Sequence, residues 1–164
     1  MRQAGIKVIA LVTLGLLAGA LEGIAAGPLD ALDGRWSGWG VVVSAGGARE
    51  RVKCVGISAV HSIEQSRGQR VEQSLTCGSA SFKLAIVARY RVEGEQITGA
   101  WEERSSAATG RLAGTVHDGL MAISIRGDNF SAAMAVTTTT CRQELDIRPQ
   151  GSDIERISVI LSKC

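Results

Sequence analysis

The chain has 164 residues, of which 45% are apolar, and its 18 basic and 16 acidic side chains give a formal charge of +2. This near balance, without any basic block, does not favour a nucleic-acid-binding protein or one held by charge on an anionic membrane surface. Twenty glycines and two prolines suit many short strands joined by tight turns, and the length suits one domain.

Residues 1–26 have the pattern of a secretory signal peptide. Arg2 and Lys7 supply the positive start, residues 8–21 form an apolar core, and small residues at 23–27 offer a cleavage site. The apolar run is shorter than the roughly 20 residues that a membrane-spanning helix needs. We therefore expect a periplasmic or secreted protein, with residues 27–164 as a single antiparallel β-barrel domain and without stable membrane insertion after cleavage.

Residues 33–44, DGRWSGWGVVVS, are predicted to form the first strand. Alternation places Trp36, Gly38 and Gly40 on one face and Trp39 on the other. The two glycines either leave room for the Trp36 ring or let the strand bend into a barrel. In both interpretations Trp36 lies at one end of the interior.

The four cysteines are an even number, which predicts disulfides in an exported chain. Of the three possible connectivities, geometry favours Cys54 with Cys77 and Cys141 with Cys164. The midpoint of each pair falls in a stretch rich in turn residues, EQSRG and PQGSD, so that each pair would face directly across a hairpin. The alternative is free or metal-bound cysteines, which the lack of a C-x-x-C motif does not favour.

The rest of the chain alternates apolar and polar residues over many short stretches. The clearest is 81–90, where Phe82, Leu84 and Ile86 share a face, and Asp118-Gly119 is a two-residue hairpin turn. After the first strand, the expected strands are 50–60, 70–78, 81–90, 96–104, 110–117, 120–126, 129–140, 141–148 and 154–164.

Eight to ten short strands without a convincing helix predict an all-β fold. Such a meander closes into an up-and-down barrel or folds into a β-sandwich, and we expect the barrel because closure removes exposed strand edges. A small outer-membrane barrel also fits the length. However, the few aromatic residues and the charges within most strands do not suit a surface that faces lipid.

Gly34-Arg35-Trp36 at the start of the first strand resembles the G-x-W motif of the lipocalins and their calycin relatives. In that family the tryptophan closes one end of an eight-stranded barrel, and an arginine from the end of the barrel stacks on it. The resemblance implies a lipocalin-like barrel, with Arg142, Arg148 or Arg156 as the stacking partner.

A longer pattern consists of GRWSGWG, then GAWEE at 99–103, and a C-terminal cysteine. This pattern is similar to a family of small exported bacterial β-proteins without an assigned function. The resemblance supports a periplasmic location.

Candidate catalytic residues are few. His61 and His117 have no partners at metal-binding or catalytic spacing, and Glu102 and Glu103 point to opposite faces of a strand, so they cannot form a glycosidase-like acid pair. The motifs G-x-S-x-G, Walker A and H-E-x-x-H are all missing. We therefore expect a non-enzymatic protein with no catalytic residues, metal or cofactor.

Trp36, Trp39 and Trp101 are the candidate ligand or partner surface, although strand tryptophans more often pack in a core. We expect a binding module for a small apolar ligand or a protein partner. The alternative is a structural envelope protein with a filled barrel. A cavity lined by the face of Phe82, Leu84 and Ile86 would favour a ligand, whereas a filled interior with an exposed Trp39 would favour a protein partner.

Overall fold

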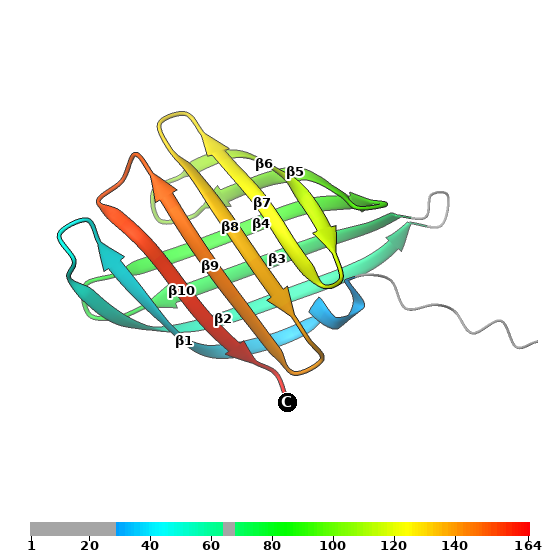
Figure 1. Ribbon diagram of the computed structural model, residues 1–164, viewed down its shortest axis with the longest axis horizontal. Helices are drawn as coiled ribbons and strands as arrows, with labels where there is room; N and C mark the ends of the chain where they lie inside the picture. The colour runs from blue at the N-terminus through cyan, green and yellow to red at the C-terminus, as the bar shows by residue number, and fades with distance from the viewer. Residues whose placement is uncertain (1–28, 64–67) are drawn as a thin grey trace, which may run out of the picture.

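The computed structural model describes residues 29–63 and 68–164, which form a closed barrel of ten antiparallel strands (Figure 1). Each strand pairs with the next along the chain, and β1 closes the barrel by pairing with β10. The short 3₁₀ helix η1 (Asp30–Leu32) precedes β1. The strands are β1 (Gly34–Ser44), β2 (Arg49–Ile63), β3 (Gly68–Gly78), β4 (Lys83–Glu93), β5 (Gln96–Glu103), β6 (Ala108–His117), β7 (Leu120–Gly127), β8 (Ser131–Thr138), β9 (Arg142–Gln150) and β10 (Ile154–Ser162).

The predicted all-β barrel is thus confirmed, and a β-sandwich does not form. The expected signal peptide at 1–26 lies outside the described residues. None of the helices in the described part of the chain is long and apolar enough to cross a membrane.

Apolar side chains fill the interior because alternate residues of each strand face inward. On β4, for example, Tyr90 and Val92 are buried, whereas Arg89 and Arg91 are exposed. Arg89 pairs with Glu72 of β3 on the outer surface, at 3.0 Å. The core therefore lies inside the barrel, and these charged side chains lie outside it.

Glycines allow neighbouring strands to approach closely at several points of the wall. A Cβ atom at Gly38 of β1 would lie 2.0 Å from the backbone oxygen of Ile160 in β10, and one at Gly114 of β6 would lie 2.1 Å from that of Ala122 in β7. Gly38 therefore accommodates the adjacent strand and not the Trp36 ring. Of the two interpretations of this glycine, bending of the wall is the one that the contacts support.

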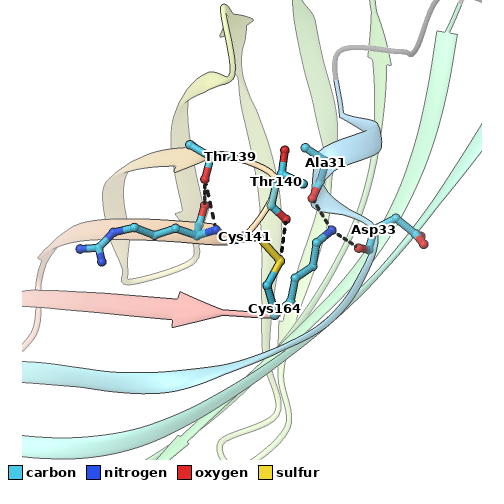
Figure 2. The surroundings of a disulfide bond; sticks show 8 residues. Ala31, Asp33, Thr139, Thr140, Cys141 and Cys164 are labelled. Atoms are coloured by element: carbon cyan, nitrogen blue, oxygen red, sulfur yellow. Dashed lines mark hydrogen bonds between the residues drawn. A yellow bond between two sulfur atoms is a disulfide. The ribbon is translucent and has the colours of Figure 1, made fainter.

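The two disulfides form the expected pairs, but only one of them lies within a ladder. Cys54 and Cys77 are directly opposite in β2 and β3. Arg142 pairs with Ser162, so that continuing this register would place Cys141 opposite Lys163 and not opposite Cys164. The expectation of two directly facing pairs is therefore wrong for the second disulfide, which lies just beyond the ends of β9 and β10 (Figure 2).

Most strand boundaries agree with the sequence pattern to within a few residues. The Asp118-Gly119 turn has positive φ at both positions, 47° and 77°, as its hairpin type requires. β2 and β4 each continue three residues past the expected end: β2 reaches Ile63 because its ladder with β3 extends to Gly68, and β4 reaches Glu93 because its ladder with β5 extends to Gln96. His61, which follows the expected strand 50–60, therefore lies within β2.

Candidate functional site

One end of the barrel, called here the closed end, is sealed by η1 and by Trp36. The Trp36 side chain is only 1% exposed, and it packs in the core together with the buried Leu29 and Leu32. Its indole Nε1 donates a hydrogen bond of 2.8 Å to the backbone oxygen of Leu32. Gln69 of β3 completes the seal, because it accepts from the Leu29 N–H.

A lysine, and not an arginine, lies on Trp36. The Lys163 ammonium is 4.7 Å from the centroid of the indole ring and donates hydrogen bonds of 2.8 Å to the backbone oxygens of Ala31 and Asp33 (Figure 2). This cation–π contact and the two hydrogen bonds fasten the end of β10 to η1. The neighbouring Cys141–Cys164 disulfide holds the same end of the chain.

The implied arginine partners of Trp36 are therefore wrong. Arg142, Arg148 and Arg156 occupy outward positions, where they pair with Glu144 and Asp146. They face outward because they alternate with inward residues of β9 and β10.

The opposite end, called here the open end, contains an apolar cavity of about 160 Å³. Its wall includes Phe130 and Ser152, which lie in the loops after β7 and β9. The partly exposed Leu84 and Ile86 also line it, so that the cavity opens to solvent here. An apolar cavity of about 150 Å³ can bind benzene. The interior is therefore not completely filled by its own side chains.

The lining of the cavity is nearly all aliphatic and aromatic, and none of its described side chains is charged. The expected face of β4 contributes Leu84 and Ile86, while Phe82 packs against the core beside it. Other members of the lining are Trp101, Ile123, Met134 and Ile147.

Trp101 of β5 is a fixed part of this wall. Its Nε1 donates to the backbone oxygen of Arg126 at 3.2 Å, and its ring meets Phe130 edge to face at a centroid distance of 5.9 Å. A Cβ atom at Gly127 would lie 3.2 Å from the Trp101 ring, so that this glycine leaves space for the indole. These contacts hold the Trp101 side chain against the wall of the cavity.

Trp39 lies on the outer surface and is 50% exposed. It pairs with the exposed Ile160 of β10, and the Arg51 guanidinium lies 4.3 Å from the centroid of its ring. The three tryptophans thus occupy the closed end, the cavity wall and the exterior, and do not form one surface. That Trp39 contacts a protein partner stays a prediction.

Three polar residues, Gln73, Tyr90 and Ser152, interrupt the apolar lining. The Tyr90 hydroxyl donates to Gln73 Oε1 at 3.3 Å, and both residues line the cavity. Burial raises the pKa of Tyr90, so that its phenol stays neutral. Sequence reasoning missed Gln73, although it lies at the inward position between Val71 and Leu75 of β3.

The acidic pair of β5 is divided between the two faces, as expected. Glu102 faces outward beside Arg89, at 3.8 Å. Glu103 accepts hydrogen bonds from the Ala85 N–H at 3.1 Å and from both the N–H and the hydroxyl of Ser106 at the open end. The Glu103 carboxylate therefore ties a loop to β4.

The histidines have separate surroundings. His61 is exposed on β2. His117 lies between Glu95, at 2.9 Å, and Asp118, at 3.2 Å. The hydrogen bond that its ring donates to the Glu95 carboxylate and the negative charges of both acids raise the pKa of His117. In residues 29–63 and 68–164, no three histidine, cysteine or acidic side chains gather as metal ligands would.

No family model matches this chain, and a search of the curated proteins finds no match. Among solved structures, the chain is similar to the S-type phycobiliprotein lyase CPES from Guillardia theta, with a TM-score of 0.53 and 11% sequence identity. The match covers 82% of this chain and 88% of the lyase chain. At this identity the likeness concerns the fold alone, which is consistent with a lipocalin-like barrel.

This comparison overturns the expectation that the chain is not an enzyme, because the similar barrel is that of a lyase. The expectation was based on missing local motifs. A function depends on the site that a fold carries, and such a site does not need any of those motifs.

Proposed function

We propose that this protein binds a small apolar molecule inside its barrel. The observation that carries the proposal is the cavity of about 160 Å³, which has an uncharged, mainly apolar wall and opens at one end. Moving apolar surface from water into such a cavity is favourable, by roughly 25 cal/mol for each Å² that is buried. The sealed closed end gives the ligand one route of entry and exit.

We also propose that the barrel works after export and without insertion into a membrane. Two disulfides suit an oxidising compartment such as the periplasm or the extracellular space. The apolar interior and the ion-paired exterior are the reverse of a membrane barrel, whose outer surface carries an apolar band. The proposal concerns the binding step, which a carrier and an enzyme have in common.

A pair of neighbouring alanines on β8 offers a matched test. Ala132 lines the cavity and is 5% exposed, whereas Ala133 is exposed on the outer face of the same strand. We expect Ala132→Leu to fill part of the cavity and to weaken binding of α-methylstyrene by roughly tenfold or more, while Ala133→Leu leaves it unchanged. Binding is measured by NMR shift titration, and thermal melting confirms that both variants fold.

Two results would contradict the proposal. One is equal binding by wild type, Ala132→Leu and Ala133→Leu, which would place the ligand outside the cavity. The other is a wild-type protein whose resonances do not respond to α-methylstyrene or to acetophenone at their solubility limits.

A further inference from the structure

The polar side chains of the cavity lining are Gln73, Tyr90 and Ser152, and the Ser152 hydroxyl donates to the backbone oxygen of Ile154 at 3.3 Å. Gln73 faces inward from β3, and Tyr90, which is 3% exposed, faces inward from the neighbouring β4. The Tyr90 hydroxyl donates to Gln73 Oε1 at 3.3 Å. This bond occupies the oxygen of the Gln73 amide and restrains its orientation.

The nitrogen of the same amide is left without a partner. Gln73 Nε2 has no hydrogen-bond acceptor within residues 29–63 and 68–164, and the surrounding protein does not enclose it. An amide nitrogen carries two N–H donors. Because Gln73 lines the cavity, a ligand there meets a donor that no protein group satisfies.

The charge of the ligand is also restricted. No described Lys, Arg or His lines the cavity, so that a ligand carboxylate would have no cation to pair with. Burying an unpaired charge costs far more free energy than burying a neutral carbonyl that accepts a hydrogen bond. A free fatty acid with its carboxylate inside the cavity is therefore disfavoured.

We propose that the cavity selects an uncharged apolar molecule with a carbonyl-type acceptor, and that Gln73 Nε2 donates a hydrogen bond to this acceptor. Ketones, aldehydes and esters are the chemical classes that fit. Tyr90 is the positioning residue, since it holds the Gln73 amide with its N–H groups available. This inference rests on the proposed function and adds the chemical class of the ligand to it.

Three probes of equal size separate the contributions of apolar burial, of the hydrogen bond and of a negative charge to the affinity. Acetophenone, α-methylstyrene and benzoate have the same number of non-hydrogen atoms and the same planar shape, but carry a carbonyl, a methylene and a carboxylate. We expect wild type to bind the two neutral probes and benzoate at least tenfold more weakly than acetophenone. Affinities are measured by NMR titration at neutral pH.

The decisive variant is Gln73→Met, which keeps the side-chain length and removes the donor. We expect it to weaken acetophenone binding by roughly three- to tenfold and to leave α-methylstyrene unchanged or tighter. Tyr90→Phe should weaken the binding of acetophenone by a smaller factor and leave the binding of α-methylstyrene unchanged. A merely structural role of Tyr90 would affect the binding of both probes.

Gln143→Met is the matched control, because Gln143 is another inward-facing glutamine, 1% exposed, that does not line the cavity. It should preserve the ratio of the two affinities. If Gln73→Met changes both neutral ligands equally, or if benzoate binds as tightly as acetophenone, the inference is wrong while the proposed function stands. If wild type binds neither neutral probe, the proposed function itself fails.

Discussion

Single polar residues at inward positions distinguish this interior from a plain apolar core. Gln73 follows Val71 in the inward alternation of β3, and Lys163, one residue past the end of β10, continues the alternation of Leu161. Alternation could therefore have predicted that both side chains face inward. It could not have predicted the contacts of Lys163, whose acceptors are 132 and 130 residues away in the sequence.

At the same scale, Glu103 makes a pH-dependent contribution to stability. Burial alone would raise its pKa, but hydrogen bonds from the Ser106 hydroxyl and from the backbone N–H groups of Ser105, Ser106 and Ala85 lower it from 4.5 to about 2. A lowered folded-state pKa adds stability above the unfolded value, and this stability is lost as the pH falls from about 4.5 towards 2. We expect Glu103→Gln to lose less stability than wild type over this range.

Urea unfolding of both proteins at pH 6 and pH 3 measures this difference. The Glu103 carboxyl resonance gives the pKa directly, and a value at or above 4.5 in the folded protein would refute the proposed role of these hydrogen bonds.

Among the elements, the strands were largely predictable and their ends were not. An apolar–polar alternation is a local property, and it correctly placed the strand of Tyr90 and the Asp118-Gly119 hairpin. A strand end depends on the ladder with its neighbour. For this reason β2 extends to Ile63. β8 ends at Thr138, because the next residue, Thr139, donates its backbone N–H to the oxygen of Arg142 in the turn that follows.

Glycines make the β1–β10 seam possible, and Gly38 is the sharpest case. A methyl group there would lie 2.0 Å from the Ile160 backbone oxygen, so that Gly38→Ala should force the two strands apart. We expect the free energy of unfolding to fall by about 1–3 kcal/mol or more, as measured by urea denaturation. Gly46→Ala is the control, because a Cβ atom there meets nothing within 4 Å. Similar stabilities for the two variants would mean that the seam tolerates a side chain.

For the whole molecule, the barrel and the disulfide pairs could be predicted, but the cavity could not. Closure follows from a meander of alternating strands, whereas an empty space depends on the summed volumes of side chains from many strands. Small residues such as Ala88 and Ala132 face larger ones in the lining, and which of them meet depends on the register. The summed volume of these side chains therefore cannot be read from the alternation of apolar and polar residues.

Removal of a disulfide tests how the closed end is held. Both bridges join cysteines 23 residues apart, so that the chain-entropy model assigns each a similar stabilisation of about 3 kcal/mol. We expect the Cys141→Ser/Cys164→Ser variant to lose about this much in urea unfolding, and the Cys54→Ser/Cys77→Ser variant to lose more. Cys54 and Cys77 are 0% exposed, so that their replacement also buries two hydroxyls, whereas Cys141 and Cys164 are exposed. Only the Cys141→Ser/Cys164→Ser variant should shift the Trp36 indole N–H resonance, because it frees the segment that carries Lys163.

An unmoved Trp36 resonance in the Cys141→Ser/Cys164→Ser variant would show that Lys163 keeps its place without the bridge. The hydrogen bonds to Ala31 and Asp33 would then be sufficient to hold it.

An even number of strands returns the chain to the end from which it started. η1 and Cys164 lie near the two ends of the described chain, and both lie at the closed end of the barrel (Figure 1). A tag or anchor fused after Cys164 would therefore extend from the closed end. A protein attached to a support through such a tag would have its open end facing the solution. Immobilised in this orientation, the protein would keep its entrance accessible to the small molecule that we propose it binds.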